Sequence, residues 1–254
     1  MSKPLRILVT NDDGYGSAGI QVLAAAARGL GEVTVVAPDR EQSATSHSLT
    51  IHHPLRAKRG ADGAGWMLDG TPTDCVSIAV NALLDERPDV VLSGINHGSN
   101  MGEDVLYSGT VSAAMEATVL GIPAIAFSYV GREGIEAWEG SVRRLLESVL
   151  DDDFGSFPAD TLLSVNLPAI PPEQVKGVRV TTLGRRRYSD SITTALDPSG
   201  REYYWIGGGT SAWSGSEDSD FRAVQAGLVS VTPLHLDLTN YRLLEEIRGW
   251  DLQV

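Results

Sequence analysis

Hydrophobic residues in the first part of the chain form short continuous runs that alternate with stretches of helical spacing. The run at residues 5–10 is nearly all apolar, which is typical of a strand buried on both faces of a parallel sheet, and residues 19–30 follow with helical spacing. A second run at residues 32–37 ends at Pro38, and a polar stretch at residues 39–48 separates it from an expected strand at residues 49–59. A loop of that length is usually functional, so residues 39–48 are candidates for a site.

The clearest helix start lies at Thr71, which is followed by Pro72 and Asp74. A threonine N-cap, a proline at the first helical position and an acid three residues after the cap favour a helix with a capping box, which we expect to run to about residue 85. Further strands are expected at residues 89–93, 124–128 and 161–165, and further helices at residues 111–120, before Gly121, and at residues 136–150. This alternation predicts an α/β fold around a parallel sheet.

The pattern changes after Pro171 and Pro172. Residues 178–183, 202–206 and 228–234 are typical of antiparallel strands, separated by turns at residues 185–190 and 207–220. The chain therefore divides into a core at residues 1–170 and a C-terminal β-rich extension at residues 171–254. Four aromatic residues of this extension either meet a partner subunit or pack on their own domain: Tyr203, Tyr204, Trp205 and Trp213.

Composition narrows the class of protein. A length of 254 residues with 42% hydrophobic and 21% charged residues fits one α/β domain with a sizeable core. The net charge of -13 repels duplex backbones and anionic lipids, so we expect no nucleic-acid duplex and no membrane as a partner. The single cysteine, Cys75, and the lack of an apolar leader before the first strand favour the cytoplasm.

Oxygen-bearing side chains follow the expected parallel strands. Asp12 and Asp13 come after the first strand, Ser43 lies in the long polar loop, and Asn96 follows the strand at residues 89–93. The carboxyl ends of parallel strands meet at one edge of a sheet, where ligands bind, and such oxygen donors suit Mg²⁺ or Mn²⁺. The alternative is that one aspartate caps the next helix and the other is solvated. In that case Ser43 and Asn96 only form hydrogen bonds within their loops.

A glycine pattern overlaps this site. Residues 14–19 match G-x-G-x-x-G after a strand, and Asp39 lies where a ribose-binding acid is expected in a dinucleotide enzyme. Two carboxylates at the entry of that turn would repel a pyrophosphate, which argues against a dinucleotide unless a metal ion lies between them.

A candidate phosphate site lies at Ser108, Gly109 and Thr110, where hydroxyls and free N–H groups begin the helix at residues 111–120. An ordinary N-cap is the alternative, although the glycine-rich residues 94–102 before it favour close approach to a ligand. His47, His97 and His235 are candidates for acid, base or phosphate donor, with structural roles as the alternative.

Five motifs occur in a fixed order: ILVTNDDG, APDREQSATSHSLT, DGTPTDCV, LSGINHGSNMG and YSGTVSAAMEA, with RRRY, EYYW and VSVTPLHLDLT further on. Together they closely resemble the SurE family of survival-protein 5′/3′-nucleotidases over essentially the whole chain. The resemblance implies a Rossmann-like three-layer core, one divalent metal ion per subunit, hydrolysis of nucleoside monophosphates and short polyphosphate, and a homodimer or homotetramer with exchanged C-terminal elements.

Mapped onto this chain, the resemblance places the metal ligands at Asp12, Asp13, Ser43 and Asn96. It places phosphate binding at Ser108, Gly109 and Thr110, with Asn11 and His47 beside the phosphate. Tyr107 stands where some members carry histidine, which leaves the general acid unassigned.

These residues predict a metal-dependent phosphomonoesterase in which a metal-activated water attacks phosphorus. In this reading Asp12 orients the water or acts as base, and Asn96 with the helix end at residues 108–110 stabilises the developing charge. A covalent phosphate on Asp12 is a variant of the mechanism. The alternatives from other classes are a non-catalytic nucleotide sensor that uses the same site and a dinucleotide-dependent oxidoreductase.

Overall fold

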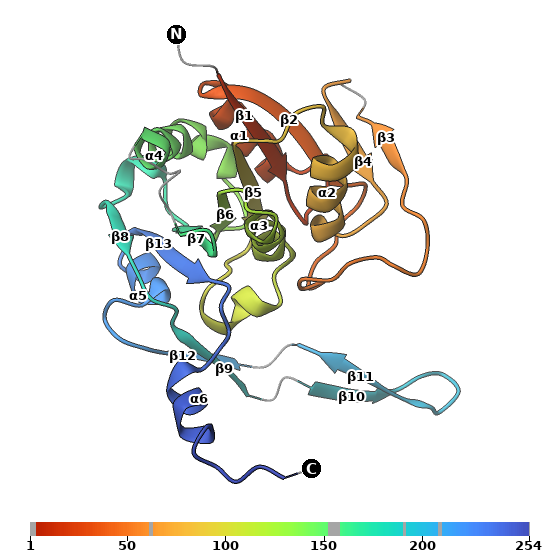
Figure 1. The fold of residues 1–254 in the computed structure, drawn as a ribbon, viewed down its shortest axis with the longest axis vertical. Coiled ribbons are helices and arrows are strands. Elements are labelled where there is room, and N and C mark those ends of the chain that lie inside the picture. The colour runs from red at the N-terminus through yellow and green to blue at the C-terminus, as the bar shows by residue number, and fades with distance from the viewer. Residues whose placement is uncertain (1–3, 61–62, 152–157, 190–191, 208–209, 254) are drawn as a thin grey trace.

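A nine-stranded sheet with helices on both faces forms the centre of the molecule (Figure 1). The computed structural model describes residues 4–60, 63–151, 158–189, 192–207 and 210–253. The strand order is β3-β4-β2-β1-β5-β6-β7-β13-β8, and the six strands from β4 to β7 run parallel. The prediction of a three-layer, Rossmann-like α/β fold is confirmed.

The strands of the central sheet are β1 Leu5–Thr10, β2 Gly31–Pro38, β3 Ala57–Arg59, β4 Gly65–Leu68, β5 Val90–His97, β6 Ala124–Tyr129, β7 Thr161–Leu167, β8 Val178–Val180 and β13 Val229–His235. Two further antiparallel pairs lie outside it, formed by β9 Arg185–Ser189 with β12 Thr210–Ser214 and by β10 Ile192–Leu196 with β11 Glu202–Ile206. The helices are α1 Ala18–Arg28, α2 Pro72–Ile78, α3 Gly109–Val119, α4 Glu139–Asp151, α5 Asp220–Gln225 and α6 Tyr241–Ile247. Shorter helical turns are η1 Ala79–Leu83, η2 Gly102–Leu106, η3 Ile135–Trp138 and η5 Pro172–Gln174.

Strand β1 contributes to a hydrophobic core on each face of the sheet, because successive side chains of a strand point to opposite sides. Ile7 and Val9 belong to the core that includes α1 and α4, whereas Leu8 belongs to the core that includes α2 and α3. A strand covered on both faces needs apolar residues at consecutive positions, which is why residues 5–10 lack polar alternation.

The helix start at Thr71 has the predicted capping box. The Thr71 hydroxyl accepts a hydrogen bond from the Asp74 N–H, and the Asp74 carboxylate accepts one from the Thr71 N–H, with Pro72 in the first turn. The helix continues through η1 to Leu83, close to the expected end.

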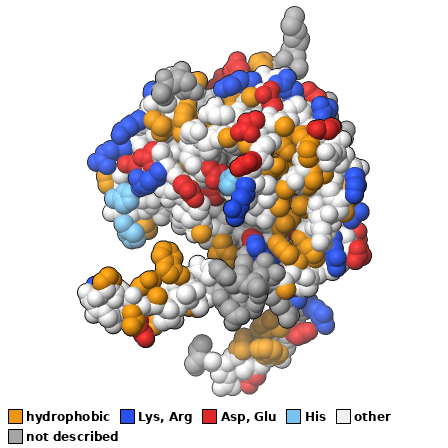
Figure 2. Space-filling model, turned by 180° about the vertical axis from the view of Figure 1, so that it is seen from behind, with side chains coloured by type: hydrophobic (Ala, Val, Ile, Leu, Met, Phe, Trp, Pro, Cys, Tyr) orange, Lys and Arg blue, Asp and Glu red, His pale blue; other side chains and the backbone are white. Residues whose placement is uncertain are grey.

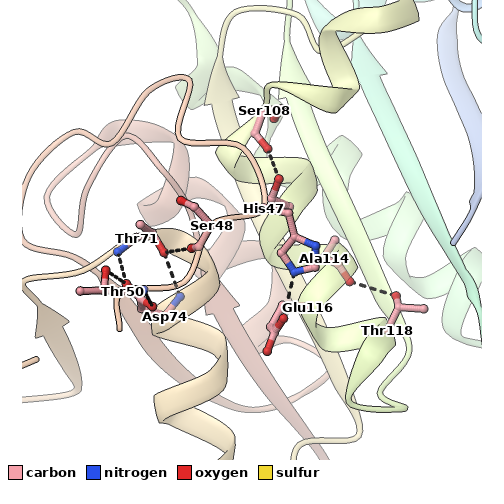
Figure 3. A network of polar contacts seen from close by, with 10 residues as sticks. His47, Ser48, Thr50, Thr71, Asp74, Ser108, Ala114, Glu116 and Thr118 are labelled. Carbon is pink, nitrogen blue, oxygen red and sulfur yellow. Dashed lines mark hydrogen bonds and ion pairs between the residues drawn. The ribbon is translucent and has the colours of Figure 1, made fainter. Parts of the chain in front are cut away.

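The prediction of a strand over residues 49–59 is wrong for most of its length, since only Ala57–Arg59 is extended in the sheet. Thr50 instead donates to Asp74 from its main-chain N–H and its hydroxyl, and the Thr71 hydroxyl donates to the Ser48 carbonyl. Ser48 and Thr50 are therefore bonded to the start of α2 rather than to a neighbouring strand (Figure 3).

The C-terminal segment contributes more to the sheet than its pattern predicts. Strand β13 pairs antiparallel with β7 and parallel with β8, so the sheet crosses the expected division at residue 170. The expected turns at residues 185–190 and 207–220 in fact contain the paired strands β9 and β12, because Arg185–Ser189 and Thr210–Ser214 form a ladder with each other. Residues 190, 191, 208 and 209 lie outside the described part of the chain.

Apolar side chains remain exposed on the two projections formed by β10–β11 and by α6 with the following residues (Figures 1 and 2). Trp205 is 66% exposed and Ile206 is 87% exposed, and Tyr204 and Trp250 are also exposed. Trp213 differs, because its ring stacks on Phe221 at 5.2 Å between centroids and so packs on its own chain. Within the described ranges, no helix combines the length and apolar character needed to span a bilayer.

Candidate active site

The carboxyl ends of β1, β2, β5 and β6 deliver their loops to one edge of the sheet. The loops after β1 and β2 are bonded to each other, since the Tyr15 N–H donates to the Pro38 carbonyl at 2.9 Å and the Gln42 N–H donates to the Asp12 carbonyl at 2.7 Å. Gly14 has a φ of +97°, the left-handed region that glycine adopts readily, and this allows the turn after β1 to lie against residue 40. The topology therefore brings the predicted polar segments together.

Asp12 lies beneath the first turn of α3. Its carboxylate accepts a hydrogen bond from the Thr110 hydroxyl, and only 4% of the residue is exposed. Gly109 packs against it so closely that a Cβ there would lie 2.8 Å from the Asp12 Cβ. Burial raises the pKa of Asp12 to about 6, with Asp13 adding to the rise and the Thr110 hydrogen bonds opposing it.

Asp13, Ser43 and Asn96 line one cleft of about 420 Å³, whereas the buried Asp12 is not among its lining residues. The Asp13 carboxylate accepts a hydrogen bond from the His97 N–H at 2.9 Å, while burial raises its pKa. The Asn96 amide donates to the Gly98 carbonyl, which leaves its oxygen as the donor atom for a cation, and the Ser43 hydroxyl donates to Glu41. These three predicted metal ligands therefore line the same cleft.

The donor set fits a hard divalent cation. Within the described ranges, no three His, Cys, Asp or Glu side chains lie close enough together to hold a metal ion. Two carboxylates with neutral hydroxyl and amide oxygens match the ligands that Mg²⁺ and Mn²⁺ prefer. A cation there would also offset the cost of placing Asp12 and Asp13 side by side in a partly buried site.

Asn11 shapes the turn that carries both aspartates. Its amide donates to the Gly14 carbonyl at 3.0 Å and to the Ser17 hydroxyl at 2.7 Å. Its side-chain oxygen is buried and has no hydrogen-bond partner among the described residues. A buried acceptor without a donor is costly, so this oxygen is suited to a donor brought by a ligand or water.

Ser108 is the N-cap of α3, and its hydroxyl accepts from the Val111 N–H at 3.0 Å. Ser108 is therefore an ordinary N-cap, as the alternative interpretation of the sequence expects. The first turn of α3 that it caps lies against Asp12. A helix N-terminus above a carboxylate pair is suited to an anion only when a cation neutralises that pair.

His47 is held against α3 by Glu116, with 2.9 Å between its Nε2 and the Glu116 Oε2 (Figure 3). The Ser46 N–H also donates to the Tyr107 carbonyl, so the polar loop is bonded both to α3 and to the segment before it. His47 thus holds the loop that carries Ser43, and its ring is directed at Glu116. The other histidine candidates also have partners, since His97 bonds the Arg132 carbonyl and His235 pairs with Asp160.

Two buried groups of polar contacts were not among the sequence candidates. Asn100 and Asn166 exchange hydrogen bonds of 3.0 Å, and the Asn100 amide donates to the Ser128 hydroxyl. Asp220 accepts from the N–H groups of Gly102 and Gly184 and so ties η2 to the C-terminal segment. Asn166 and Ser128 do follow the pattern of polar residues at strand ends, whereas nothing in the sequence pairs Asp220 with Gly102.

The glycine-rich turn after β1 has a packing role. A Cβ on Gly19 would lie 1.9 Å from the Ile95 carbonyl oxygen, so α1 can approach β5 only with glycine there. Close helix–strand packing accounts for this part of the dinucleotide-like pattern.

Comparisons with a family model, with curated proteins and with solved structures all point to the same protein family. The family model described as survival protein SurE matches residues 7–190. The chain belongs to the SurE family. It is 58% identical to the 5′-nucleotidase SurE of Gemmatimonas aurantiaca over 97% of this chain and 98% of that protein, and 51% identical to that of Geobacter metallireducens over 97% and 98%.

A SurE crystal structure has the same fold. The SurE protein from Aquifex aeolicus superposes with a TM-score of 0.82 at 45% sequence identity, covering 96% of this chain and 98% of that one. Membership of SurE supports nucleotidase activity over the other function classes that the sequence left open.

Proposed function

We propose that this chain is a divalent-metal-dependent phosphomonoesterase that hydrolyses nucleoside 5′- and 3′-monophosphates to nucleoside and phosphate. The observation that carries the proposal is the buried Asp12 carboxylate under the N-terminus of α3, followed in the chain by Asp13, which lines a cleft together with Ser43 and Asn96. The curated relatives named 5′-nucleotidase SurE support the substrate class.

Asp12, Asp13, Ser43 and Asn96 would hold one Mg²⁺ or Mn²⁺ ion per subunit. When bound, the cation neutralises phosphoryl charge and lowers the pKa of water. Asp12 orients the attacking water and accepts its proton as the general base. Burial raises the pKa of Asp12 to about 6 in the metal-free protein, and a bound cation would lower it. Thr110 keeps Asp12 in one orientation through its hydroxyl hydrogen bond.

The phosphoryl group lies at the start of α3 in this proposal. Gly109 and Thr110 present the helix end to the developing charge on its oxygens, and Asn96 completes the contact from β5. Asn11 contributes by holding the turn through Gly14 and Ser17. The terminal phosphate of short polyphosphate would use the same contacts.

We further propose that the protein acts as a cytoplasmic homodimer or homotetramer. The exposed apolar residues of β11 and α6 support self-association, because a soluble monomer rarely leaves such side chains uncovered. The single buried Cys75 is compatible with a reducing compartment.

The test is a phosphate-release assay over 5′- and 3′-nucleoside monophosphates with chelator, and again after Mg²⁺ or Mn²⁺ is restored. We expect activity to disappear with chelator and to return with the metal. Asp12→Asn should abolish turnover at any metal concentration, whereas excess metal should rescue much of the activity of Ser43→Ala. Nucleotide binding without phosphate release would favour the sensor, and full activity in excess chelator would remove the metal from the proposal.

A further inference from the structure

The helical turn η2 links the C-terminal segment of the chain to the start of α3. It covers Gly102–Leu106, and Ser108 follows as the N-cap of α3. The Asp104 carbonyl accepts hydrogen bonds from the N–H groups of Tyr107 and Ser108, at 3.1 and 3.2 Å. The position of the helix cap therefore depends on the position of Asp104.

Arg186 on β9 holds η2 from the C-terminal side. Its guanidinium donates to the Asp104 carboxylate, and its main-chain N–H donates to the Glu103 carboxylate at 2.6 Å. The side chains of Arg186 and Asp104 are only 25% and 16% exposed, so solvent screens this ion pair less than a surface pair. The guanidinium also lies over the ring of Trp213, 4.9 Å from its centroid, and that ring stacks on Phe221. Arg186 is thus fixed in one orientation while it contacts η2.

The segment that Arg186 holds is bonded to both halves of the proposed site. The Tyr107 carbonyl accepts from the Ser46 N–H at 3.2 Å, in the loop that carries Ser43. On the other side, Gly109 packs against Asp12. A displacement of η2 would therefore reach a predicted metal ligand and the helix end together.

We propose that Arg186 is a positioning residue for the start of α3, and that it acts through Asp104. This inference rests on the proposed function, in which the phosphoryl group lies at residues 108–110. A planar guanidinium can pair with a carboxylate and stack on an aromatic ring at the same time, which suits Arg186 to this place between Asp104 and Trp213. The C-terminal extension thus affects turnover in its own chain.

The experiment measures kcat and KM for adenosine 5′-monophosphate at saturating Mn²⁺ in Arg186→Gln, Asp104→Asn and the double variant. We expect each single variant to lose about 10-fold in kcat, with KM changed less than about threefold, because the helix end stabilises charge that develops in the transition state. The double variant should lose no more than either single variant, since the two side chains act as one pair. Arg186→Lys should recover kcat to within about threefold of the wild type, because the ammonium group keeps the charge but not the stacking.

The matched control is Arg185→Gln, one position earlier on the same strand, where the side chain is exposed. It should keep the wild-type kcat. Hydrogen–deuterium exchange of residues 102–110 gives a second measurement that does not depend on turnover. Exchange should be faster in Arg186→Gln than in the wild type or in Arg185→Gln, because η2 and the cap of α3 open more often once the ion pair is lost.

An unchanged kcat in Arg186→Gln, with only a lower stability in urea, would overturn the proposal, because Arg186 would then serve the fold alone. Additive losses in the double variant would also overturn it. If the wild type releases phosphate from no monoester while exchange rises only in Arg186→Gln, the nucleotidase function fails and the link from Arg186 to α3 is retained. Equal exchange in all variants contradicts the link whatever the turnover.

Discussion

The adjacent residues Asp12 and Asp13 have different environments in this site. Asp12 is almost fully buried and contacts α3, whereas Asp13 is half-buried and lines the cleft beside the His97 N–H. The two carboxylates have different partners, the Thr110 hydroxyl on α3 for Asp12 and the His97 N–H at the end of β5 for Asp13. That divergence supports separate roles, with Asp12 as base and ligand and Asp13 as ligand alone.

Replacing Gly109 by alanine should reduce phosphate release about 100-fold, because displacing a catalytic group by about 1 Å can cost that much. The new Cβ would lie 2.9 Å from the Asp12 Oδ2 and 3.1 Å from the Pro72 Cγ, so either α3 or Asp12 must move. Gly16→Ala is the matched control in a nearby turn, since a Cβ at position 16 meets no atom within 4 Å. Steady-state kinetics of both variants test this, and equal activities would contradict it.

The stability of the metal-free protein should fall as the pH rises from about 4 to about 6. In this window the unfolded chain has lost the Asp12 proton, at an ordinary pKa of 3.8, while the folded protein retains it up to a pKa of about 6. The unfolded state therefore binds fewer protons, and full ionisation of Asp12 in the folded protein costs about 3 kcal/mol.

Urea unfolding in chelator at pH 4 and pH 7 measures most of this loss. Saturating Mg²⁺ should reduce it, because the cation stabilises the ionised form. Asp12→Asn has no such proton to lose, so its stability should change less over the same interval. A variant that loses as much stability as the wild type would show that other groups cause the effect.

At the scale of elements, the sequence predicts which polar residues gather at one edge of the sheet, because the carboxyl ends of parallel strands all lie at that edge. Asp12, Asp13 and Asn96 directly follow or end parallel strands, so their convergence was predictable from topology. The conformation of residues 49–56 was not predictable from the sequence. Thr50 has β propensity, yet its polar groups bond to Asp74 on α2, and this contact exists only in the folded protein. Pairs such as Gly102 with Asp220 are separated by 118 residues, and no local pattern encodes them.

Asp220→Asn should destabilise the fold by about 1–3 kcal/mol, the cost of leaving a buried donor without an acceptor. The carboxylate accepts from three main-chain N–H groups, those of Gly102, Gly184 and Phe221, while burial raises its pKa. An asparagine amide would direct its own N–H₂ group at one of these donors. Urea unfolding against the exposed control Asp218→Asn measures the difference, and equal stabilities would show that the three bonds contribute little.

At the scale of the whole molecule, the two projections are the candidate surfaces for self-association. Hairpin β10–β11 and helix α6 extend from the body and carry exposed apolar side chains (Figure 2). We expect sedimentation equilibrium at micromolar concentration to give a mass of two or four chains, because burying these side chains on a partner is favourable. Trp205→Ser/Ile206→Ser should shift that mass toward the monomer, whereas Val119→Ser, an exposed apolar position on α3, should not. A single-chain mass for the wild type would contradict the prediction.

The position of β13 has a consequence for how the protein folds during synthesis. The strand that covers the edge of β7 lies at Val229–His235, so every parallel strand of the sheet leaves the ribosome before its last antiparallel partner exists. Until then β7 presents unpaired N–H and C=O groups, which are prone to pair with other chains. A nascent chain that stops near residue 170 would contain Asp12, Ser43 and Asn96 and yet aggregate. Completion of the sheet, rather than assembly of the site residues, is therefore the late step in its biogenesis.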